Sequence, residues 1–68
     1  MKEKILLGKQ IRHLRTRRRF NQRVLAERAR IGQKYLSNIE RGKENPALDT
    51  LLRLCRVLKV EPWEIFIG

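Results

Sequence analysis

The chain has 68 residues, with 17 Lys and Arg against 7 Asp and Glu, which gives a net charge of +10. A chain of this length buries only about 60% of its unfolded surface, so it supports one small core and leaves little protein to shape a deep enzyme cleft. The charge indicates a polyanionic partner. Because Cys55 and His13 are the only cysteine and histidine, a disulfide framework and a zinc site are excluded.

Nothing in the sequence indicates a membrane or an exported protein. The apolar run at residues 5–7 is far shorter than the roughly 20 residues of a membrane span, and no small-residue cleavage site follows it. We therefore predict a cytoplasmic protein with a single domain over residues 1–68, no cofactor, no metal and no enzymatic activity.

A first helix is predicted over residues 5–18. Leu7, Ile11 and Leu14 recur at spacings of four and three, which places them on one face. Gly8 would weaken this helix by roughly 1 kcal/mol relative to Ala. We therefore expect close packing or a close backbone approach at that glycine.

Two short helices follow, over residues 22–29 and 33–41, with only three residues between them. Asn21 is a good N-cap for the first and Gly32 a tolerable one for the second, while Gly42 can supply a left-handed residue at its end. So short a join forces a sharp crossing of the two helices. We expect them to pack through apolar residues, namely Leu25, Ala26, Ala29, Ile31, Leu36 and Ile39.

A fourth helix is predicted to begin at Pro46, whose ring disfavours helix at Asn45 and suits a first helical turn, and to run to about Leu58. Residues 62–67 are predicted to form one or two turns of a fifth helix. The residues expected to be buried in these two segments are Leu48, Leu51, Leu52, Cys55, Leu58, Val60, Pro62, Ile65 and Phe66.

The third helix separates its side chains by angle. Five polar residues, none of them acidic, fall within an arc of roughly 140°, while Tyr35, Leu36 and Ile39 lie opposite and should face the core. Gln and Asn pair bidentately with adenine, Lys and Arg with guanine, and Ser with either, so the arc has the chemistry of major-groove base readout. An ordinary solvated face is the alternative. The five residues are Gln33, Lys34, Ser37, Asn38 and Arg41.

The segment QRVLAERARIGQKYLSNIERG at residues 22–42 resembles the helix-turn-helix unit of the phage repressor and Cro family. LGKQIRHLR, YLSNIERGKENPALDTLL and LKVEPWEIF extend the resemblance over nearly the whole chain. It implies an all-α, compact five-helix lambda-repressor-like domain with a central helix-turn-helix. It also implies a sequence-specific regulator of double-stranded DNA, a repressor that binds a palindromic operator as a homodimer. The chain departs from the family at Arg19, Arg30 and Lys59, where glycine is usual at helix ends that need positive φ.

The same resemblance implies roles for residues around the third helix. Gln22 would reach the DNA backbone, Lys43 and Asn45 would touch phosphates beyond the third helix, and Arg15 would form a structural ion pair with Glu40. A plain first-turn residue and a solvated loop are the alternatives for the first three. Residues 9–30 hold nine basic side chains, Arg15 included, against Glu27 alone. For Arg17, Arg18, Arg19 and Arg23, solubilising charge is as good an explanation as phosphate attraction. The further backbone-contact candidates are Asn21, Arg17, Arg18, Arg19 and Arg23.

Trp63 is expected on the outside of the core, where it would mark an interface together with Ile67. The resemblance implies dimerisation through this region, which would set two recognition helices about 34 Å apart on one face of DNA. An apolar cap on the core is the alternative for Trp63. A second hypothesis for the chain is an antitoxin-like protein-interaction module that uses the same region. Membrane-surface or RNA binding through the arginine-rich first helix is less favoured, because its apolar stripe is needed for the core.

Overall fold

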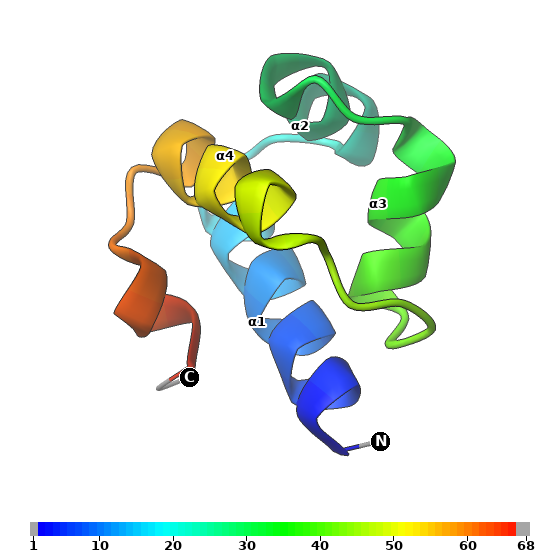
Figure 1. Cartoon of the computed structure of the whole chain (residues 1–68). Helices are drawn as coiled ribbons and strands as arrows, with labels where there is room; N and C mark the ends of the chain where they lie inside the picture. Colours follow the sequence, from blue (N-terminus) through cyan, green and yellow to red (C-terminus); the bar gives the residue numbers. More distant parts are fainter. Residues whose placement is uncertain (1, 67–68) are drawn as a thin grey trace.

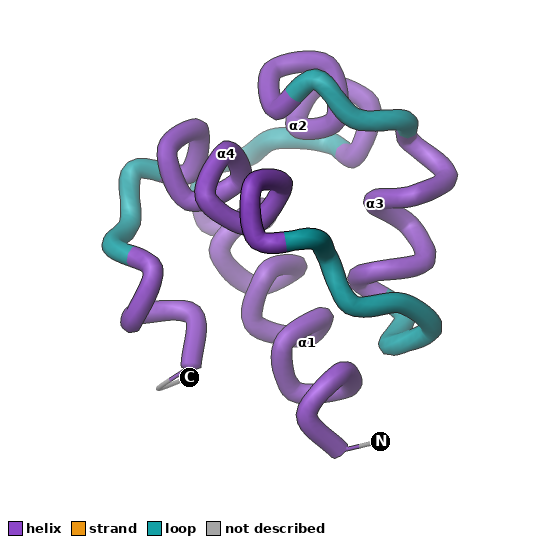
Figure 2. Tube along the Cα trace, in the orientation of Figure 1, coloured by secondary structure: helices purple, strands orange, loops and turns teal. Residues whose placement is uncertain are grey.

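The structure is a computed structural model that describes residues 2–66 and the side chains of residues 4–65. All regular structure in this part of the chain is helical (Figure 2), which confirms the predicted all-α class. The elements are α1 (Lys2–Arg17), α2 (Gln22–Ala29), α3 (Gln33–Glu40), α4 (Leu48–Leu58) and a short 3-10 helix, η1 (Pro62–Phe66).

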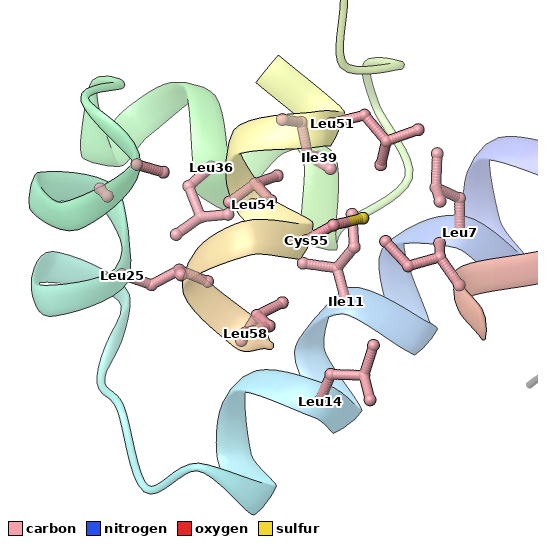
Figure 3. Close-up of a cluster of buried hydrophobic side chains, with 13 residues drawn as sticks. Leu7, Ile11, Leu14, Leu25, Leu36, Ile39, Leu51, Leu54, Cys55 and Leu58 are labelled. Carbon is pink, nitrogen blue, oxygen red and sulfur yellow. The ribbon is translucent and has the colours of Figure 1, made fainter. Parts of the chain in front are cut away.

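The helices surround one core. α2 packs against α3 and α4, while α1 packs against α3 and η1. In Figure 1, α3 lies at the right of the molecule and η1 at the left, so the two are on opposite sides. Figure 3 shows buried side chains from all four α-helices converging between them. The residues with no exposed surface include Ile11, Leu25, Ala29, Leu36, Ile39, Leu54 and Leu58.

Gly8 lies where α1 approaches the end of α3. A Cβ atom there would lie 2.8 Å from the carbonyl oxygen of Glu40 and still closer to that of Ile39. No larger residue fits without moving one of the two helices, so the predicted close backbone approach is confirmed.

All four α-helices end in the same way, with a left-handed residue followed by two hydrogen bonds back into the last turn. After α2, for example, Arg30 has a φ of 61°, its N–H donates to Glu27, and the N–H of Ile31 donates to Ala26. This arrangement is the Schellman motif, in which the left-handed position favours glycine. Only Gly42, with a φ of 76°, meets that preference; Arg19, Arg30 and Lys59 adopt positive φ despite their side chains.

The buried face of α4 differs from the predicted one. Leu48 is 71% and Leu52 41% exposed, whereas Leu54 and Thr50 are buried. Taking Leu51 as zero, the buried residues span roughly 260° to 40° around the helix, while Leu48 and Leu52 lie at roughly 60° and 100°. The predicted stripe was therefore rotated, because leucines on both sides of the true face made its centre ambiguous.

Several helix boundaries also differ from the predictions. α1 begins at Lys2 rather than at residue 5, and Arg41 follows α3 as its C-cap. Pro46 lies before α4, which begins at Leu48 with Ala47 as its N-cap. The fifth element is a 3-10 helix; it buries Ile65 but leaves Pro62 exposed, contrary to prediction. The predicted burial of Phe66 concerns a side chain outside the described set.

Cys55 is buried in α4, as predicted for a small hydrophobe. Burial raises the pKa of its thiol above the usual value, and the nearby carboxylates of Glu64 and Glu61 raise it further. The thiol is therefore protonated at neutral pH and unreactive.

Candidate nucleic-acid interface

The turn between α2 and α3 fixes how the two helices meet. Asn21 caps α2 by accepting a 2.8 Å hydrogen bond from the N–H of Val24, as predicted. After the left-handed Arg30, Gly32 returns to extended backbone (φ −71°, ψ 146°) and α3 begins. Because both ends of the turn are held by backbone hydrogen bonds, α3 has a defined direction relative to α2.

The polar face of α3 points away from the core. Gln33, Lys34 and Arg41 are exposed, and Ser37 and Asn38 are half-buried. On the opposite side Leu36 and Ile39 are completely buried. Tyr35, predicted to face the core, packs against it and is half-buried. Its hydroxyl accepts a 3.0 Å hydrogen bond from the N–H of Ala47 in the loop before α4.

Glu40, the last residue of α3, accepts three hydrogen bonds through its carboxylate. The guanidinium of Arg15 donates to its two carboxylate oxygens at 2.7 and 3.0 Å, and the Nε2 of Gln22 donates to Oε1 at 3.1 Å. The carboxylate side chain is only 2% exposed and the arginine side chain 11%. Arg15 also donates to the carbonyl oxygen of Phe20 at 2.9 Å. A buried carboxylate thus joins α1, the start of α2 and the end of α3, and its charge is neutralised away from the polar face.

Gln22 therefore has a role that the sequence did not indicate. Its amide contacts a carboxylate 18 positions later, while its contact with a phosphate stays a prediction. Residues so far apart in sequence leave no local pattern that could reveal the contact.

The loop after α3 carries Lys43 and Asn45, both exposed. Glu44 lies between them and was not among the predicted site residues. Its Oε2 accepts a 3.1 Å hydrogen bond from the Nδ2 of Asn38, so an acidic side chain lies beside the polar face. Its position in a polar loop gave no sign of this contact.

The remaining basic candidates are spread over the surface. Arg17, Arg18 and Arg19 are exposed at the end of α1, and the first two line a pocket with Leu58, Lys59, Val60 and Glu64, from the end of α4 and η1. Arg23 is exposed and pairs with Glu27 at 3.3 Å. Their predicted contacts with phosphate rest on charge alone.

Trp63 is 61% exposed on η1. Ile67, the other predicted interface residue, lies outside the described residues. Within the described part of the chain, no group of three or more potential metal ligands occurs, and no helix is long and apolar enough to cross a membrane.

Comparison with known proteins identifies the fold and its family. A family model described as a helix-turn-helix domain matches residues 6–65. The chain superposes on the restriction-modification controller protein C.AhdI from Aeromonas hydrophila with a TM-score of 0.94 and 32% identity, covering 97% of this chain and all of that one. The chain belongs to the helix-turn-helix family of the phage repressor and Cro type.

Curated relatives point the same way. The immunity repressor protein of Bacillus phage phi105 is 36% identical over 81% of this chain, and the HTH-type transcriptional regulator ImmR of Bacillus subtilis (strain 168) is 39% identical over 79%. The chain spans only 38% and 42% of the lengths of these two relatives.

Proposed function

We propose that this chain is a sequence-specific regulator of transcription that binds double-stranded DNA through α3, with residues 1–68 acting as one domain. The observation that carries the proposal is the polar face of α3, which contains no acidic residue. This face points outward because the opposite face of the helix is buried in the core. A straight helix with such a face fits the major groove and can hydrogen-bond to base edges. Relatives named as repressors and transcriptional regulators support this proposal.

The base-contacting residues in this proposal are Gln33, Lys34, Ser37, Asn38 and Arg41. Contacts to phosphate come from the start of α2 and the loop after α3, with Lys43 and Asn45 nearest to α3 in sequence. The side-chain amide of Gln22 donates to Glu40, so a contact with a DNA phosphate would need its remaining N–H when DNA is bound. A helix N-terminus with free N–H groups attracts a phosphate whichever side chain stands there.

We further propose that the protein acts in the cytoplasm as a repressor and binds a palindromic operator as a homodimer. The exposed side chain of Trp63 supports an interface at η1, because aromatic residues are enriched in protein–protein interfaces. Two copies related by a twofold axis would present their α3 helices to successive major grooves. A lone copy would recognise only one half-site.

Selection of bound duplexes from a random pool tests these points together. The wild-type protein should enrich one palindromic sequence. Gln33→Ala should relax the preference at a single base pair in each half-site, at a cost of about 1–3 kcal/mol, because one set of base contacts is lost while the rest remain. Lys59→Ala, at the end of α4, is the matched control and should select the same sequence. Loss of affinity for every duplex equally in Gln33→Ala would show that α3 does not read bases.

A further inference from the structure

Glu44 combines two features that conflict at a DNA-binding surface. It is exposed, and it is hydrogen-bonded to Asn38, one of the proposed base-contacting residues. A carboxylate beside the phosphates of a duplex is repelled by them, so it lowers affinity for DNA of any sequence. The contact with Asn38 therefore calls for a role in something other than affinity.

The loop does not need this contact to keep its shape. The N–H groups of Gly42 and Lys43 donate to the carbonyl oxygens of Ile39 and Asn38, at 3.1 and 2.9 Å, and so close the end of α3 through the backbone alone. What the carboxylate of Glu44 holds is the side-chain amide of Asn38.

The direction of that hydrogen bond follows from chemistry. An ionised carboxylate can only accept, so the NH2 group of the Asn38 amide must face Glu44 and the carbonyl oxygen must face elsewhere. An unrestrained amide turns over readily, because this torsion has a broad, roughly two-fold profile. Glu44 removes that ambiguity.

The amide keeps one N–H and its carbonyl oxygen for another partner. One donor beside one acceptor matches the N7 acceptor and the N6 amino donor that adenine presents in the major groove. The same pair fits guanine poorly, because guanine presents two acceptors there.

We propose that Glu44 is a positioning residue that orients the amide of Asn38 to read adenine, and that this gain in discrimination comes with a loss of general affinity. The inference rests on the proposed function, since it assigns a base preference within the same DNA-binding face.

The test uses the operator found by selection and takes the base pair at which Asn38→Ala loses its preference. Binding is measured for that duplex, for its three substituted forms at this pair, and for a random duplex. Wild-type protein should prefer adenine. Glu44→Ala should reduce the preference about three- to tenfold and at the same time bind the random duplex more tightly.

Three further variants separate orientation from charge. Glu44→Gln should lower the preference part of the way toward that of Glu44→Ala, because its neutral amide can either accept from the NH2 group of Asn38 or donate to its carbonyl oxygen and so no longer fixes one orientation. Glu61→Ala removes an exposed carboxylate from the segment before η1, on the side of the molecule away from α3 (Figure 1), and should leave the preference unchanged. In the Asn38→Ala background, Glu44→Ala should no longer affect the preference.

An unchanged preference in Glu44→Ala, an effect that persists without Asn38, or a preference for a base other than adenine would each overturn the inference while leaving the proposed function standing. A wild-type protein that selects no sequence would overturn both.

Discussion

At the scale of single residues, Glu40 links three helices through a carboxylate whose burial is unfavourable unless its charge is paired. Its carboxylate is almost fully buried, and the two partners that satisfy it come from α1 and α2. Removing one member of a buried ion pair leaves the other charge without compensation, which costs more than the pair itself contributes. The position of α3 therefore depends on all three side chains.

Glu40→Ala should lower the free energy of unfolding by about 3–5 kcal/mol, as measured by urea unfolding, because Arg15 would keep a buried charge with no opposite charge beside it. Glu27→Ala removes an exposed carboxylate, 66% accessible, from a surface pair and should change stability by less than about 1 kcal/mol. Replacing both members, as Arg15→Met with Glu40→Leu, should recover much of the loss. Equal stability of Glu40→Ala and Glu27→Ala would contradict this account of the ion pair.

At the scale of elements, all four α-helices end with the same backbone geometry, although only one of them has glycine at the left-handed position. The residues that follow the left-handed positions after α1, α2 and α4 are Phe20, Ile31 and Val60, and each packs against the core. An apolar residue at this position commonly accompanies the Schellman motif. Burial of these three side chains offsets the backbone strain at Arg19, Arg30 and Lys59.

Arg30→Gly should raise the free energy of unfolding by about 0.5–1 kcal/mol, since glycine relieves roughly 1–2 kcal/mol of left-handed strain and loses part of it to chain entropy. Gly42→Ala is the opposite change and should destabilise, because φ is 76° and the new methyl would meet Ile5. Thermal unfolding followed by circular dichroism measures both. A destabilised Arg30→Gly would mean that the arginine side chain contributes more than its backbone costs.

Much of this element-level structure follows from local patterns. Leu7, Ile11 and Leu14 marked the buried face of α1, and Asn21 and Gly42 marked helix ends, because each signal lies within a few residues of the feature that it predicts. The buried face of α4 depended on which of its leucines meet other helices, and the sequence carries no local sign of that.

The site divides in the same way. The periodicity of α3 predicted that Leu36 and Ile39 face inward, and they do. The contact of Gln22 with Glu40 depends on how two helices meet, and that of Asn38 with Glu44 depends on the path of an irregular loop, so both required the structure.

At the scale of the whole molecule, charge and shape act together. A net charge of +10 on so small a domain creates a long-range attraction for a polyanion, while base contacts act only at close range. The two contributions are separable because salt screens the first far more than the second.

Affinity for operator and for random DNA should therefore both fall steeply with salt. If a dimer neutralises roughly 6–10 phosphates, binding should weaken by about 10³- to 10⁵-fold between 50 and 200 mM salt. Fluorescence anisotropy of a labelled duplex over that range measures the slope, and unfolding at the same salt concentrations serves as the control for folding. A nearly flat dependence would contradict phosphate binding as the main source of affinity.

The absence of a side chain at Gly8 has an evolutionary consequence. Because α1 meets the backbone of α3 there, and Arg15 and Gln22 hold Glu40 at the end of the same helix, α3 is placed by contacts that do not involve the side chains proposed to meet the bases. Exposed residues of α3 such as Gln33 and Lys34 can then be exchanged singly without removing those contacts. If α3 reads bases as proposed, such exchanges would change the preferred DNA sequence while the contacts that place the helix are kept.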